Sequence, residues 1–321
     1  MSLAHDPAAE AAELVGPDIT VRVLEPSPPT VHDGPFFADD PATAGTSDQP
    51  VVTPTSGGDL TWDDLLAERP ELADFAAERW LGNRGRLPAV PANYPVARDA
   101  FHRLAYGVVA EARKRANTKF GLRYTRGGFG TPFFGDDEQV RVEGTRLIHQ
   151  RAGDADAIEI TTLRAAADFL GVEPCADAAE HDSPELGDHD EVLAVTEETG
   201  VFLGAWFGLA WAVIEELRLT PGAHDVERTQ LWPGHFDPAI AMGDAEVGGR
   251  ATYGMSPGDH GHDEPYLYVG AWGEVDRDDP YWNETSFNGA AMSFADLAAA
   301  DDPFVAALTF FRTGYVSLNP D

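Results

Sequence analysis

The chain contains one cysteine in 321 residues and no apolar run long enough to span a membrane. Cys175 has no partner for an internal disulfide, which agrees with a reducing compartment. The longest apolar stretch, residues 201–214, is interrupted by Gly204 and Gly208 and falls short of the roughly 18 residues that a membrane span requires. The first residues are acidic and alanine-rich, whereas a secretory signal has a basic start and an apolar core. These absences predict a cytoplasmic protein with a buried helix at residues 201–214.

Positive charge is also scarce. Lys and Arg total 22 against 55 Asp and Glu, so the formal net charge is −33. Nucleic-acid phosphates and anionic lipids repel such a chain, so we expect neither general nucleic-acid binding nor membrane attachment. The acidic composition favours solubility and says little about activity. No motif identifies a cofactor, and the sequence leaves the oligomeric state open.

Residues 1–58 are predicted to form an extended arm. They contain nine prolines and many Asp, Ala, Ser and Thr residues, a composition that buries little apolar surface. Ile19–Val23 alternates like a short strand, and Phe36–Phe37 is a second segment that can dock on the body of the protein. The body then begins near residue 59.

The remaining sequence predicts an α+β protein, with antiparallel sheet packed against long helices, because its elements do not alternate as βαβ units. Helical periodicity covers residues 59–80, 96–117, 162–170, 191–219 and 293–313. Strand signals cover residues 121–124, 140–142, 147–148, 158–161, 229–232, 236–242, 249–256 and 266–273, with loops at 126–132, 174–190 and 274–288. The order suggests a duplicated helix-plus-sheet unit, with halves at residues 59–190 and 191–321, or one compact domain from 59 to 321.

Three motifs lie in the second half: Leu231-Trp232-Pro233-Gly234-His235-Phe236-Asp237, then Tyr253-Gly254-Met255-Ser256-Pro257-Gly258-Asp259, then Glu264-Pro265-Tyr266-Leu267-Tyr268. Over about residues 100–315 the chain resembles a bacterial family of uncharacterised proteins, a domain of unknown function with a Trp-Pro-x-His-Phe-Asp signature and a Ser-Pro-Gly-Asp turn. The resemblance implies a shared fold and a cytoplasmic setting, and it implies no activity, cofactor or substrate. His260 and His262 lie outside the signature.

Residues Gly254 to Gly258 match the Gly-x-Ser-x-Gly pattern of hydrolase nucleophile elbows. An elbow needs the backbone N–H of the residue after the serine for its oxyanion hole, and Pro257 has none. We therefore interpret Pro257-Gly258 as a type II turn.

His235, Asp237 and Asp259 are the candidate catalytic residues, because a carboxylate beside an imidazole fixes its tautomer and raises its pKa. His260 and His262 are a weak candidate pair of metal ligands, since residues two apart in an extended segment project to one side. Both groups have a structural alternative. His235 and Asp237 can form hydrogen bonds within an aromatic-rich turn, and His260 and His262 can lie in a solvated acidic loop.

An island of positive charge occupies residues 112–135, which contain no Asp or Glu. Arg123 and Arg126 lie beside Gly127 and Gly128, whose backbone amides can form an anion-binding nest. The alternative is that these cations only cap the carbonyl groups of the preceding helix and that the glycines only form a turn.

Tyr253 and Tyr268 are candidates to line the same cleft, although aromatic residues at alternate strand positions more often belong to a core. The sequence therefore predicts a small anionic ligand bound between the Arg123–Thr131 loop and the region of His235 and Asp259. Two alternatives are a hydrolase, with or without a metal, that uses His235 with Asp237 or Asp259, and an acidic interaction protein.

Overall fold

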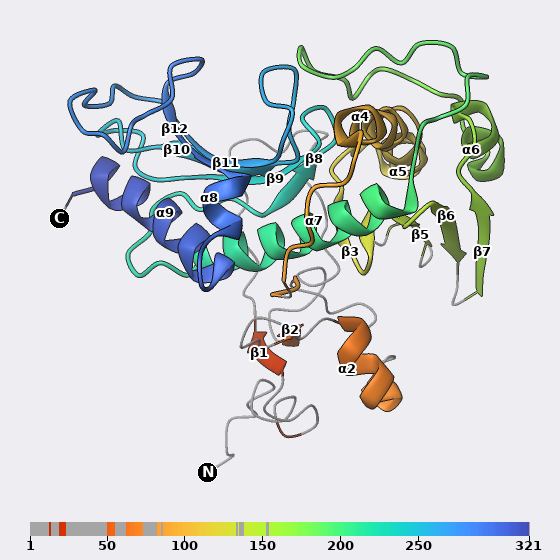
Figure 1. Ribbon diagram of the computed structural model, residues 1–321, viewed down its shortest axis with the longest axis horizontal. Coiled ribbons are helices and arrows are strands. Elements are labelled where there is room, and N and C mark those ends of the chain that lie inside the picture. The colour runs from red at the N-terminus through yellow and green to blue at the C-terminus, as the bar shows by residue number, and fades with distance from the viewer. Residues whose placement is uncertain are drawn as a thin grey trace.

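The structure is a computed structural model (Figure 1). It describes Glu13 and residues 19–23, 50–54, 62–72, 82–84, 86–132, 134, 138–151 and 154–320. Phe36–Phe37 and most of the predicted arm lie outside these ranges. The predicted strand at Ile19–Val23 is confirmed as β1, which pairs antiparallel with β2 (Pro50–Pro54).

The first half of the protein is a helix followed by an antiparallel meander. The helix runs as α4 (Tyr94–Leu104), a π-helical turn η2 (Ala105–Val109) and α5 (Ala110–Asn117), after the short segments α2 (Trp62–Glu68) and η1 (Pro70–Leu72). The sheet contains β3 (Arg123–Thr125), β4 (Gly128–Gly130), β5 (Glu138–Glu143), β6 (Arg146–Arg151) and β7 (Asp154–Glu159) in that order. Helix α6 (Leu163–Leu170) follows it.

The second half repeats this plan. Helix α7 (Glu197–Leu217) precedes a meander of β8 (Gln230–Trp232), β9 (Asp237–Met242), β10 (Ala251–Ser256), β11 (Tyr266–Ala271) and β12 (Gly289–Ser293). Helices α8 (Phe294–Ala298) and α9 (Pro303–Leu318) close the chain. The predicted α+β class is thus confirmed, and both five-stranded sheets are antiparallel.

The two meanders meet at their first strands. Leu122 and Leu231 exchange two backbone hydrogen bonds of 2.9 Å, so β3 and β8 join the sheets through an antiparallel bridge. Next to this junction, the rings of Phe129 and Phe236 pack edge to face with centroids 5.0 Å apart. The backbone bridge and this ring contact therefore join the two halves of the chain.

Helix α7 is the core element that both sheets share. In Figure 1 it follows the long axis of the molecule, from the side of β5 to β7 toward α9. Among the described residues it is the one helix long and apolar enough to cross a membrane, and 83% of its apolar window is buried inside the protein. Its position between the sheets and the outer helices explains why it is apolar on nearly every side.

Two glycines of α7 let the hairpin turns of the first sheet approach the helix backbone. A Cβ atom on Gly200 would lie 2.5 Å from the carbonyl oxygen of Gly144, and one on Gly204 would lie 2.6 Å from the carbonyl carbon of Gly127. The neighbouring atoms are backbone atoms, which cannot rotate away as a side chain can. Gly204, which interrupts the apolar run in the sequence, is therefore a packing position. Gly208 also packs closely, since a Cβ atom there would lie 2.9 Å from the Cβ atom of Asn83.

Several sequence predictions differ from the structure at strands that are short or rich in small residues. Residues 128–130 form β4, although their glycines indicated a loop, and residues 289–293 form β12, which the sequence did not reveal. The predicted final helix is two helices, α8 and α9. Such strands are held by ladder hydrogen bonds to their neighbours, so their local sequence carries little strand signal.

Candidate functional site

A cavity of about 670 Å³ lies on the face of the second sheet that is turned away from α7. Its floor includes small or polar residues that alternate with buried core residues along β9, β10 and β11: Ala239, Ala241, Thr252, Ser256 and Gly270. Tyr253 and Leu267 point to the opposite face, into the core. Small floor residues leave room for a ligand, and we call this space the site cavity.

Aromatic side chains form the walls of the site cavity. Trp232, Tyr266, Tyr268, Trp272 and Phe287 all line it. Tyr268 lies across β10, because a Cβ atom at Gly254 would be only 2.4 Å from its hydroxyl oxygen. Trp272 is 57% exposed, so its ring is open to solvent.

A segment from the first half of the protein borders the cavity. Residues 174–190, here the acidic segment, contribute Glu180 and Asp182 to the lining. Helix α4 and its continuation hold the segment: Arg103 donates to the carbonyl oxygen of Leu186 at 2.9 Å, and the Tyr106 hydroxyl donates to that of Pro184 at 2.7 Å. The predicted exposed loop is thus a structural part of the site.

The carboxylate partner of His235 is Asp182. The Nδ1 atom of His235 lies 2.9 Å from Oδ2 of Asp182, whereas the sequence predicted Asp237 or Asp259 as its partner. Burial alone lowers the pKa of His235, but the Asp182 hydrogen bond and the charges of Asp237, Asp182 and Glu180 outweigh it and raise the pKa to about 9. His235 is therefore an imidazolium at neutral pH, suited to donate a proton and unsuited to be a general base.

Asp237 is buried at the start of β9, with 2% of its surface exposed. The Tyr268 hydroxyl donates a 2.5 Å hydrogen bond to its Oδ2 atom. Its Oδ1 atom is buried and has no hydrogen-bond partner. Burial raises the pKa of Asp237, and the nearby His235 charge and the Tyr268 hydrogen bond only partly oppose this. A buried carboxyl group with one free oxygen is a strong acceptor for a ligand that carries N–H or O–H groups.

Asp259 also lines the site cavity, and it is held by its own loop. Its Oδ2 atom accepts a 2.6 Å hydrogen bond from the Tyr266 hydroxyl, and its Oδ1 atom accepts the backbone N–H groups of Gly261 and His262. Burial raises the pKa of Asp259, but these hydrogen bonds and the nearby His262 outweigh it, so the pKa is lowered. Asp259 is thus a fixed negative charge, and the Tyr266 ring forms a wall held against it.

His102, which the sequence did not single out, positions the loop that carries His235. Its Nε2 atom lies 3.0 Å from the carbonyl oxygens of both Pro233 and Gly234, and its ring stacks on Phe236 at 5.1 Å. Two carbonyl acceptors require that Nε2 carry the proton. Burial lowers the pKa of His102 to about 4, so the ring remains a neutral donor at neutral pH.

Phe236 has a left-handed backbone, with φ of 59°, which is strained for a residue with a bulky side chain. His235 and Asp237 flank Phe236, and both line the site cavity. The stacking of Phe236 on His102 belongs to the packing that sustains the strained turn.

Four other predicted ligand-binding residues lie outside the lining of the site cavity: Arg123, Arg126, Gly127 and Gly128. Arg123 is 3% exposed, donates to the carbonyl oxygen of Tyr124 and lies 5.5 Å from the Trp211 ring, while Gly127 and Gly128 pack on α7. Tyr253 lies in the core against Phe311. Of the predicted residues, the structure brings His235, Asp237, Asp259 and Tyr268 together, and it does not bring the arginine loop to them.

The two weak metal-ligand candidates have different surroundings. His260 is exposed, while the His262 ring lies 4.2 Å from the Tyr266 ring at a tilt of 31°, 3.5 Å from Asp259 and 3.8 Å from Glu284. Within the described ranges, no group of three close metal-ligating atoms contains either histidine.

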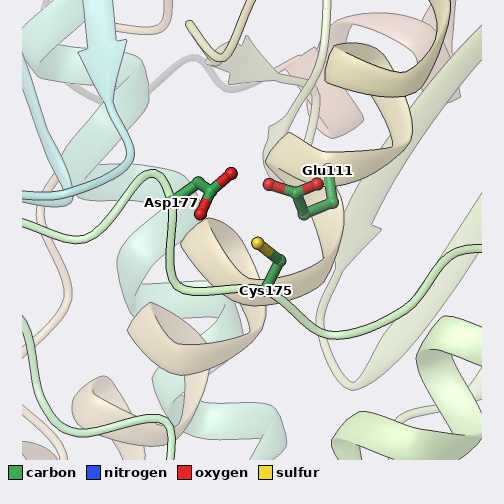
Figure 2. Close-up of side chains that lie close together, drawn as sticks. All are labelled: Glu111, Cys175 and Asp177. Carbon is green, nitrogen blue, oxygen red and sulfur yellow. The ribbon is translucent and has the colours of Figure 1, made fainter.

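Glu111, Cys175 and Asp177 do bring three such atoms within 4.8 Å of one another (Figure 2). In Figure 2 their side chains point toward one another from α5 and the acidic segment. The Lys114 ammonium already hydrogen-bonds to both carboxylates, so it supplies the positive charge that a metal ion would bring. Burial also raises the pKa of Cys175, which disfavours the thiolate that binds metals.

Replacing His235 by glutamine is expected to change how stability depends on pH. The folded-state pKa of about 9 lies above the roughly 6.5 of an exposed histidine. The charged pair with Asp182 therefore stabilises the protein fully below about pH 6.5, and this contribution is lost as the pH rises through about 9. Urea unfolding from about pH 6 to 10 should show the stability difference between wild type and His235→Gln shrinking as the pH rises. A difference that is constant with pH contradicts the pairing.

Comparison with family models, curated proteins and solved structures gives no match to the chain.

Proposed function

We propose that the protein binds a small organic cation in the site cavity. The observation that carries the proposal is Asp237, a buried carboxyl group that lines the cavity and has an unpartnered oxygen. A cation that hydrogen-bonds to this oxygen compensates for the desolvation that burial costs the carboxylate. The cytoplasmic setting predicted from composition belongs to the same proposal.

The charges around the cavity support a cation. Five carboxyl groups line it: Glu180, Asp182, Glu227, Asp237 and Asp259. Among the described lining residues the basic group is His235, whose charge is matched by Asp182. Glu227 pairs with Arg250 at 2.5 Å, outside the lining. The remaining carboxyl groups give the cavity a negative potential, which concentrates cations and repels anions.

The aromatic walls of the site cavity favour an organic cation over a metal ion. The faces of Trp and Tyr rings attract cations within about 6 Å of the ring centre, and they also bury apolar surface. Trp272 already makes such a contact with Arg250, at 4.9 Å. A cavity of about 670 Å³ with aromatic walls and a few placed polar groups fits a small organic molecule.

The anionic ligand expected from the sequence has weaker support. That expectation needed Arg123 and Arg126 beside His235, and neither arginine lines the site cavity. The carboxyl groups of Asp237 and Asp259 would repel an anion in this cavity, and among the described lining residues the His235 imidazolium would be the basic group that attracts it.

A hydrolase is the second candidate, because His235 and Asp237 are two titrating groups beside one cavity with pKa values shifted upward. Shifted pKa values are common at catalytic sites. In such an enzyme water attacks the scissile bond and gives a proton to the carboxylate of Asp237 or Asp259, while His235 donates a proton to the leaving group. Ser256 has no nucleophilic role in this scheme, since its hydroxyl oxygen accepts the N–H of Gly258.

Isothermal titration calorimetry with three ligands of matched shape tests the cation proposal: benzylamine, benzyl alcohol and benzoate. We expect benzylamine to bind at least about tenfold more tightly than the alcohol, as one desolvated charge pair predicts, and benzoate not to bind. The Arg126→Ala variant should bind benzylamine as wild type does. Tighter binding of benzoate, or no binding of benzylamine together with a panel of guanidines and quaternary ammonium ions, contradicts the proposal.

A further inference from the structure

Two carboxylate oxygens in the described part of the chain are buried and have no hydrogen-bond partner: Oδ1 of Asp182 and Oδ1 of Asp237. Both residues line the site cavity. A buried acceptor without a donor costs free energy, and native proteins leave few such groups. Two of them beside one cavity point to a ligand that supplies the missing donors.

The second oxygen of each carboxyl group is already engaged. Oδ2 of Asp182 contacts Nδ1 of His235 at 2.9 Å, and Oδ2 of Asp237 accepts the Tyr268 hydroxyl at 2.5 Å. These contacts fix the orientation of both carboxyl groups. Their free oxygens are shielded from solvent in this structure, so a ligand reaches them when neighbouring side chains of the cavity lining shift. Both carboxyl groups belong to the lining of the same cavity, and the negative charge of Asp182 contributes to raising the pKa of Asp237.

We propose that the cation bound in the site cavity is a primary ammonium group, which donates N–H bonds to Oδ1 of both Asp182 and Asp237. A primary ammonium has three N–H donors and can serve two acceptors at once. A quaternary ammonium has none, so it gains only the charge and the aromatic contacts. The inference rests on the proposed function and narrows its ligand class.

In this arrangement both halves of the protein contribute residues to the site. Asp182 comes from the acidic segment, which Arg103 and Tyr106 hold on the first half, and Asp237 begins β9 of the second half. Ser183 fastens the two together by donating a 2.6 Å hydrogen bond to the carbonyl oxygen of Gly234. The amine therefore binds where the acidic segment meets the second sheet.

Calorimetry with benzylamine and with benzyltrimethylammonium tests the inference. We expect the primary amine to bind at least about tenfold more tightly than its trimethylated analogue, because only the primary amine hydrogen-bonds to the two carboxylates. In Asp182→Asn and Asp237→Asn, His235 and Tyr268 hold the amide oxygen, so the amide NH₂ group faces the ligand. Each variant should lose about tenfold or more in affinity for benzylamine and should erase the preference over the trimethylated analogue.

Glu173→Gln is the matched control, since it removes one charge immediately before the acidic segment, at a side chain that is 88% exposed and outside the cavity lining. It should bind both probes as wild type does, and circular dichroism should show that all three variants are folded. Equal affinities of wild type for the two probes overturn the inference and leave the proposed function standing. Unchanged benzylamine binding in both aspartate variants also overturns the inference, because the ammonium group then does not need to donate hydrogen bonds to the two carboxylate oxygens. Failure of both probes to bind counts against the proposed function itself.

Discussion

Phe236→Ala is expected to lower the free energy of unfolding by about 3–5 kcal/mol, the usual cost of removing a fully buried aromatic ring. Phe236 is completely buried and contacts three other rings, those of His102, Phe129 and Phe207, at centroid distances of 5.0 to 5.1 Å. These partners come from α4, β4 and α7, so one side chain links both halves of the protein. Its loss should weaken the whole structure and not one sheet alone.

Chemical denaturation followed by circular dichroism and by tryptophan fluorescence measures this effect. Because Phe236 lies at the junction of the two sheets, we expect both signals to move together in a single transition at lower denaturant. Val316→Ala is the control, since that side chain is 63% exposed and its truncation should change stability by less than about 0.5 kcal/mol. Two separate transitions, or a loss below about 1 kcal/mol, would contradict the shared core.

Gly204→Ala is expected to destabilise the protein by about 1–3 kcal/mol, the typical cost of overpacking a core. Helix propensity alone predicts the reverse, because alanine favours a helix over glycine by about 1 kcal/mol. The packing effect should win, since the new Cβ atom would lie 2.6 Å and 2.7 Å from the carbonyl carbon and oxygen of Gly127. This clash is relieved only if helix α7 and the β3–β4 hairpin move apart.

Thermal unfolding of the Gly204→Ala variant provides the measurement, with Val201→Ala as the control in the same helix. Val201 is 52% exposed, so its replacement by alanine tests helix propensity without core packing and should be neutral or slightly stabilising. A Gly204→Ala protein that is more stable than wild type would show that the helix and the hairpin have room to move apart.

Local sequence predicted the elements that carry their own signals. The helix predicted at residues 162–170 is confirmed as α6, with the Thr162 hydroxyl accepting the N–H of Ala165 and with Gly171 in the left-handed region. The strand signals at residues 140–142 and 147–148 likewise lie on either side of the β5–β6 hairpin turn, where the φ of Gly144 is 57°. Caps and turns can be read from sequence because they depend on backbone conformations that few residues adopt.

The site was predicted only in part. His235, Asp237 and Asp259 were named from their density in one stretch of sequence, and all three line the same cavity. Asp182 was missed because it belongs to a segment whose composition indicated an exposed loop, and His102 because a lone histidine within a helix carries no signal of its position. The positive charge of residues 112–135 predicted a ligand site there, yet Arg123 donates to the carbonyl oxygen of Tyr124 and lies over the Trp211 ring.

By itself the sequence determined the α+β class, since periodicity and turn residues act over short stretches of chain. Only the tertiary structure decided what His235 pairs with and which face of the second sheet is open. Those features depend on contacts between residues that are far apart in the sequence. Asp182 and His235 are separated by 53 positions, and His102 and Pro233 by 131. No local pattern encodes such contacts, because they arise when α7 and the Leu122–Leu231 bridge bring the two halves together.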